Sequence, residues 1–205
     1  MLIWVINQSD AAAVGNEFLE RLLGKRPFQT VATAEEFVAR SSEAEHADGL
    51  ILVGDFADNL PLDPGSSASQ ALAGVFEFLT TTEQSVLALG FGFEVLCVAY
   101  GVNLREIGER GVGATKMEPT TEGSKLFQGS DPLCVAPNER WLTDEFPKKL
   151  QVLARSDTGV EAVKHKTRPL YGLQQRPEDF TYPSDAKMIY ENIFSLFDQY
   201  HAKRA

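Results

Sequence analysis

The stretch LALGFGFEVLCVAYG, residues 87–101, runs from an apolar strand through two glycines that flank Phe91 and into a helical pattern. Enzymes mount reactive side chains where a strand turns sharply into a helix, because the turn exposes one residue and the helix N-terminus stabilises developing negative charge. Here the exposed position holds Gly90, which has no side chain. The stretch therefore predicts a strand, a tight turn and a helix, with no nucleophile at the turn.

The residues before this stretch alternate between short apolar runs and helical patterns. Strands are predicted over residues 2–6, 28–32, 49–53 and 85–89, with a helix after each of the first three. Two helix starts carry capping patterns: Thr33 with Glu36, and Ser67 with Gln70. The run over 49–53 is continuously apolar, which predicts a central strand. Strands that alternate with helices favour a parallel sheet covered by helices on both faces.

From about residue 102 the pattern changes to shorter runs interrupted by glycine, proline and charged residues. These runs predict further strands that are partly antiparallel, with a long excursion between them. A closing helix is expected after Ser184, which can cap it. The length of 205 residues predicts a single domain spanning residues 1–205.

Composition restricts the partners. The formal net charge is -10 and the pI is about 4.8, so phosphate backbones and anionic membranes are repelled, and we expect neither nucleic acid nor a membrane as partner. No stretch approaches the ~20 apolar residues of a membrane span, and the N-terminus lacks a basic leader pattern. We therefore expect a cytoplasmic protein. Cys97 and Cys134 have neither CxxC spacing nor a histidine cluster, which predicts buried thiols and no metal or cofactor site.

Three segments share a resemblance. Residues 85–101, SVLALGFGFEVLCVAYG, resemble the nucleophile elbow of class I glutamine amidotransferases, an apolar strand followed by G-x-C-x-G-x-Q and a helix. GLILVGD, residues 49–55, resembles the strand and glycine loop that completes the family's oxyanion hole, and YGLQQRPE, residues 171–178, resembles its YGVQFHPE signature. The resemblance, to the GMP synthase type of glutaminase domain, implies a flavodoxin-like three-layer α/β/α fold. Its central sheet would be mostly parallel, with some antiparallel strands in the second half.

In that family a cysteine attacks the side-chain amide of glutamine, a histidine shuttles the proton and a glutamate orients the histidine. Aligned residue by residue, this chain has Gly90 at the cysteine position and Arg176 at the histidine position, while Glu178 is retained. Glycine has nothing with which to attack, and arginine stays protonated near neutral pH. The resemblance therefore implies a degenerate triad without glutaminase activity.

The other positions carried over by the resemblance are ligand contacts. The backbone N–H of Phe91 and the loop near Gly54 correspond to the oxyanion hole, Glu94 stands where the family has glutamine, and Asp144 aligns with a substrate-contacting aspartate. Leu142 takes the place of a histidine in that last segment. Cys97 cannot replace the missing nucleophile, because it lies about two helical turns beyond Gly90, roughly 10 Å along the helix axis.

Two functions stay open on these residues. One is a catalytically inactive amidotransferase-like module that binds a small molecule, a synthase-like partner protein or a second copy of itself. The other is an enzyme of different activity, a hydrolase or transferase on a small γ-glutamyl-like substrate, that uses Glu94, Asp144 or Glu178 as carboxylate acid or base.

Overall fold

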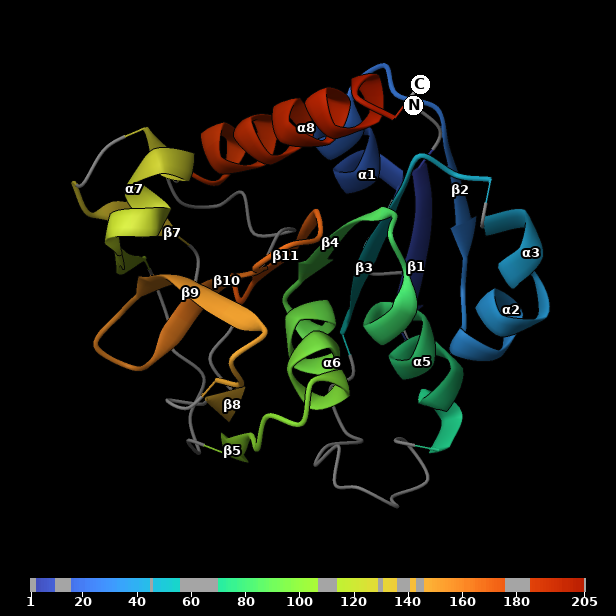
Figure 1. Ribbon diagram of the computed structural model, residues 1–205, viewed down its shortest axis with the longest axis horizontal. Coiled ribbons are helices and arrows are strands. Elements are labelled where there is room, and N and C mark those ends of the chain that lie inside the picture. Colours follow the sequence, from blue (N-terminus) through green and yellow to red (C-terminus); the bar gives the residue numbers. More distant parts are fainter. Residues whose placement is uncertain are drawn as a thin grey trace.

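The strands of the computed structural model form one mixed sheet and one small separate pair (Figure 1). The structure describes residues 3–9, 16–44, 46–55, 70–106, 114–128, 131–135, 141–142, 146–175 and 185–204. Within these residues, the strands are β1 (Ile3–Ser9), β2 (Phe28–Val31), β3 (Gly49–Asp55), β4 (Ser85–Leu89), β5 (Arg105–Glu106), β6 (Thr115–Pro119), β7 (Leu133–Val135), β8 (Trp141–Leu142), β9 (Leu150–Arg155), β10 (Val160–His165) and β11 (Leu170–Leu173).

The main sheet has the order β2-β1-β3-β4-β11-β10-β9-β6-β7. Neighbours from β2 to β11 are parallel, and neighbours from β11 to β7 are antiparallel. The predicted central strand is confirmed, because β3 pairs with β1 on one side and β4 on the other. The antiparallel second half is confirmed as well. Strand β11 is the joint between the two halves, since it returns from the antiparallel part to lie parallel to β4.

Helices cover both faces of this sheet. They are α1 (Asn16–Leu23), α2 (Ala34–Ala39), α3 (Ser41–Ala44), α5 (Ala73–Thr81), α6 (Phe91–Ala99), α7 (Thr121–Phe127) and α8 (Ala186–Ala202). One buried cluster joins side chains of α1, α7 and α8 to the sheet, and a second joins α2, α3, α5 and α6 to its other face. Figure 1 shows α1 and α8 together on one side and α6 and α5 on the other. The expected flavodoxin-like three-layer α/β/α architecture is confirmed.

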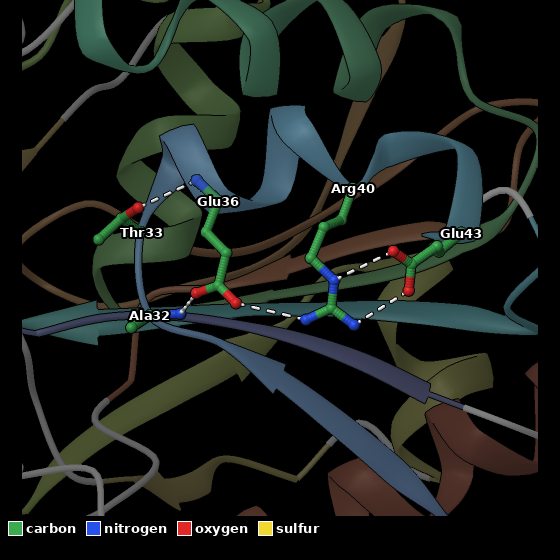
Figure 2. A network of polar contacts seen from close by, with 5 residues as sticks. All are labelled: Ala32, Thr33, Glu36, Arg40 and Glu43. Atoms are coloured by element: carbon green, nitrogen blue, oxygen red, sulfur yellow. Dashed lines mark hydrogen bonds and ion pairs between the residues drawn. The ribbon is translucent and has the colours of Figure 1, made fainter.

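The capping pattern at Thr33 and Glu36 starts α2 as predicted (Figure 2). The Thr33 side-chain oxygen accepts a hydrogen bond from the Glu36 backbone N–H, and Glu36 in turn accepts from the backbone N–H of Ala32 at 2.9 Å. Arg40 links this cap to α3, because its guanidinium contacts the carboxylates of both Glu36 and Glu43. One free helix N–H, that of Glu36, is thus satisfied, together with the N–H of Ala32 just before the cap.

The residues of the other two predicted caps lie only partly within the described ranges. Helix α5 has Leu72 at its N-cap with no side-chain hydrogen bond, and Ser67 lies outside the described residues. Helix α8 has Asp185 at its N-cap, and Ser184 lies outside the described residues. The Asp185 carboxylate does not cap the helix but accepts from the backbone N–H of Cys134 at 2.8 Å. Its side chain is used to fix β7 against the start of α8.

The described part of the chain contains no helix that is long and apolar enough to cross a membrane. Nor do histidine, cysteine, aspartate and glutamate side chains gather within it in groups that could hold a metal ion. Cys97 is fully buried as expected, whereas Cys134 is half-buried.

Candidate functional site

Gly90 forms the turn between β4 and α6. Its backbone has φ 54° and ψ -114°, and it occupies the N-cap position of α6. Its N–H donates to the carbonyl of Leu173 in β11 at 2.9 Å, and its own carbonyl accepts from the N–H of Phe93 at 3.0 Å. A positive φ is free of steric cost only for glycine, so any side chain here would be strained. The turn thus has the tight strand-to-helix geometry that the sequence predicted.

Two further glycines hold α6 against the sheet. A Cβ atom at Gly92 would lie 2.7 Å from the carbonyl carbon of Leu52 in β3 and closer still to its oxygen. A Cβ atom at Gly172 in β11 would lie 2.8 Å from a methyl carbon of Leu96 and 3.0 Å from the ring of Phe93. Both contacts are too short for real side chains, so the first turns of α6 pack directly on β3 and β11. This packing fixes where the turn stands relative to both strands.

The N-terminal part of α6 is almost entirely buried. Phe91 and Phe93 are enclosed, and Glu94 in the first turn is only 3% exposed. Burial raises the pKa of the Cys97 thiol well above its ordinary value, and the nearby Glu94 carboxylate raises it further. A thiol held neutral in this way is a poor nucleophile. Cys97 therefore packs as a small apolar side chain within α6, as the sequence predicted.

Polar side chains are also buried where β11 ends beside the turn. The N–H of Gln174 donates to the carbonyl of Glu161 in β10 at 2.8 Å, and both glutamines, Gln174 and Gln175, are buried. Within the part of the chain that the structure describes, neither the oxygen nor the nitrogen of the Gln175 carboxamide has a hydrogen-bond partner. Burying such a group unpaired is costly. Sequence reasoning missed Gln175, although the family's YGVQFHPE signature has phenylalanine at that position.

The remaining predicted site residues are placed only in part. Gly54 lies near the end of β3, opposite Gln8 of β1, two residues beyond the pairing of Leu52 with Ala88. Arg176, Glu178 and Asp144 lie outside the described residues. Strand β11 pairs in register with β4, Leu173 beside Leu89, so Arg176 follows three residues after the strand that borders the turn. That Arg176, Glu178 and Asp144 share a site with Gly90 stays a prediction.

Comparison with known proteins agrees with the family resemblance found in the sequence. The family model for glutamine amidotransferase class-I matches residues 16–196. This chain belongs to the class I glutamine amidotransferase family. It is 27% identical over 164 residues to a glutamine-hydrolyzing GMP synthase subunit from Methanosarcina acetivorans, a match that covers 77% of each chain. It is also 30% identical over 175 residues to an aminodeoxychorismate synthase of Streptomyces griseus, covering 83% of this chain and 24% of that protein.

Solved structures of amidotransferases share the fold. A protein from Thermoplasma acidophilum, described as a GMP synthase subunit, superimposes with a TM-score of 0.79 at 21% identity, covering 100% of this chain and 97% of that one. A glutamine amido transferase from Methylobacillus flagellatus gives a TM-score of 0.61 at 18% identity, covering 85% of this chain and 69% of that one. The class I glutamine amidotransferase architecture therefore extends over the length of this chain.

Proposed function

We propose that this amidotransferase is catalytically inactive and works as a binding or regulatory module in the cytoplasm. The observation that carries the proposal is Gly90, which occupies the strand-to-helix turn with φ 54° and ψ -114°. The family's cysteine is aligned with this residue, and glycine supplies no thiolate. Covalent attack on a glutamine amide needs that thiolate, so its first step has no reactant.

The proton-transfer role is lost with the nucleophile. Arg176 is aligned with the family's histidine, and a guanidinium with a pKa above about 12 does not accept a proton near neutral pH. Glu178 then has no imidazole to orient. We propose instead that Arg176 and Glu178 form an ion pair at the former site.

The surrounding site keeps features that suit a ligand. The backbone N–H of Phe91 and the loop at Gly54 are proposed to retain the oxyanion hole, and Glu94 and Asp144 the contacts of the former substrate. The carboxamide of Gln175, which has no partner among the described residues, supports a site that still holds a polar group. We propose that a small molecule occupies this place.

A protein partner is the second part of the proposal. The curated relative from Methanosarcina acetivorans is named as one subunit of a GMP synthase, a name that places it beside another subunit. We propose that this chain docks on a synthase-like partner through the surface that such relatives use, or pairs with a second copy of itself. Sedimentation of the purified chain alone separates the two, since only self-association changes its mass with protein concentration.

The inactive site is tested by covalent trapping with a glutamine-analogue electrophile, followed by mass spectrometry of the labelled residue. The unsubstituted protein is expected to take up no label at its two cysteines. The matched control is the double variant Gly90→Cys with Arg176→His, which restores thiol and base around Glu178 and is expected to be labelled at position 90. Labelling of the unsubstituted protein at Cys97 or Cys134, with matching turnover of glutamine, would show an active enzyme with a displaced nucleophile.

A further inference from the structure

A cavity of about 460 Å³ lies where strands β3 and β4 begin, at the end of the sheet opposite Gly90. Its walls come from the segment before β3, the end of α5, the segment before β4 and the end of α8. Gly90 follows the last residue of β4, whereas Glu83 and Gln84 of the cavity precede its first. The cavity is thus separate from the altered elbow. Its volume falls in the range of small-molecule sites.

The cavity brings together side chains of both charges. Asp48 lines it beside His201, Glu83 lines it with its backbone carbonyl, and Arg204 and His201 line it from the end of α8. Helices α5 and α8 both end at this cavity, and carbonyl groups at helix C-termini add negative potential. A cationic group is therefore favoured near Asp48, and an anionic group near Arg204.

Hydrogen bonds fix the walls in place. The side-chain nitrogen of Gln84 donates to the carbonyls of Ala44 and Ala47, each at 2.7 Å. The carbonyl of Glu83 accepts from Tyr200 at 3.2 Å and from Arg204 at 3.1 Å. These bonds tie the segment before β4 to both neighbouring walls. A site whose walls are already ordered loses less conformational freedom on binding.

His201 stands between Ser85 and Asp48. Its Nε2 lies 3.4 Å from the Ser85 hydroxyl and its Nδ1 lies 3.9 Å from the Asp48 carboxylate. Serine, histidine and aspartate in this spatial order form the catalytic triad of serine hydrolases. Ser85, however, is 0% exposed and does not line the cavity, so its hydroxyl cannot reach a substrate there. His201 is a fixed part of the wall, and the arrangement serves binding.

An aromatic ring supplies the apolar part of the cavity. Phe78 lines it, and its ring is held edge-on against Phe37 with centroids 5.1 Å apart. A ligand that fills the cavity therefore meets a carboxylate, a guanidinium and a fixed apolar surface together. One small molecule that satisfies all three carries an ammonium group, a carboxylate group and an aliphatic side chain.

We propose that this cavity binds a free α-amino acid with an apolar side chain. The carboxylate of the ligand pairs with Arg204, its ammonium group lies at Asp48, and its side chain packs on Phe78. The proposal does not depend on the state of the elbow, because no residue near Gly90 takes part. The site would let the concentration of an amino acid influence this protein from the far end of β4.

The test follows backbone amide signals of the full chain by ¹H–¹⁵N NMR during titration with L-leucine. Saturable shifts are expected at Gln84 and Arg204 and not at Gly90 or Phe91. Two analogues separate the charges: 3-methylbutylamine lacks the carboxylate of leucine, and 4-methylpentanoate lacks its ammonium group. Each analogue is expected to bind at least about tenfold more weakly, since each loses one charged contact.

Variants complete the test. Arg204→Gln and Asp48→Asn should each weaken leucine binding by about tenfold or more, whereas Lys203→Gln, which removes a neighbouring cation that does not line the cavity, should not. The melting temperature of each variant shows that it is folded. The proposal is overturned if leucine gives no saturable shift, if 3-methylbutylamine binds as tightly as leucine, or if the shifts gather at Gly90. None of these outcomes tests whether the elbow is catalytically inactive.

Discussion

The backbone N–H of Gly90 donates a hydrogen bond to the carbonyl oxygen of Leu173, with 2.9 Å between nitrogen and oxygen. This bond joins the turn after β4 to the last residue of β11, which lies beside it in parallel register. The chain leaves β11 through two buried glutamines and reaches Arg176 three residues after Leu173. In the sequence, only these two glutamines separate Leu173, the partner of Gly90, from the position aligned with the family's base.

Replacing Gly90 by cysteine should destabilise the protein. With φ at 54°, a residue with a side chain accepts backbone strain that glycine avoids, at a cost of about 1 kcal/mol in the free energy of unfolding. Denaturant unfolding of the parent and of Gly90→Cys measures the difference. A variant as stable as the parent would mean that the turn does not hold the conformation described.

Substitution of Gly92 should destabilise the protein more than substitution of a glycine with open space around it. Gly92→Ala places a methyl group against the carbonyl of Leu52, so it should cost more than about 3 kcal/mol or prevent folding. Gly24→Ala is the matched control. Gly24 also has a positive φ, 60°, but no atom lies within 4 Å of the added methyl, so its cost should stay near 1 kcal/mol. Equal losses in the two variants would contradict the close packing of α6 on β3.

His165 should make stability depend on pH. Its Nδ1 accepts hydrogen bonds from the backbone N–H groups of Thr167 and Arg168, which requires a neutral ring. Burial lowers the pKa of His165 below its ordinary value of 6.5, Lys149 lowers it further, and Glu83 opposes the change. The folded state then binds fewer protons than the unfolded state, so this stabilisation is present above 6.5 and is lost as pH falls below it.

The measurement is the free energy of unfolding between about pH 7.5 and pH 5, where histidine titrates. His165→Asn keeps a hydrogen-bond acceptor that does not titrate, so its stability should fall less steeply than that of the parent as pH decreases. A parent slope that His165→Asn does not reduce would show that His165 keeps its ordinary pKa on folding.

The two thiols should differ in reactivity. Cys97 is enclosed in α6 and its pKa is raised by burial and by Glu94, whereas Cys134 is half-buried in β7. A disulfide-exchange reagent should modify Cys134 in the folded protein and reach Cys97 only on unfolding. The variant Cys134→Ser should abolish the early reaction. An early reaction that persists in this variant would place Cys97 within reach of solvent.

Local patterns predicted the elements around the turn well. The apolar run over 85–89 and the glycines after it indicated a strand and a helix because such a turn leaves little choice of backbone, and Gly90 has the positive φ that only glycine adopts freely. The Thr33 cap was equally local, since both of its partners lie within four residues.

Contacts between distant residues were not predictable in this way. Asp185 at the N-cap of α8 has a side chain of a type that often caps helices, but its carboxylate accepts from Cys134 in β7, fifty-one residues earlier in the chain. The burial of Gln175 depends on how β11 lies beside β4 and β10. The cavity at Asp48 and Arg204 joins four separate segments, and no single stretch of sequence carries its pattern.

Ammonia release from L-glutamine is the most direct test of the inactive site. The unsubstituted protein should release none above the rate without protein. Gly90→Cys with Arg176→His should fold and show weak release at best, because Glu94 and Leu142 still depart from the family's substrate contacts. Each single substitution should be inactive, since a thiol without its base and a base without its thiol each lack half of the mechanism. Turnover by the unsubstituted protein, retained in a preparation from which contaminating glutaminase has been removed, would contradict the account.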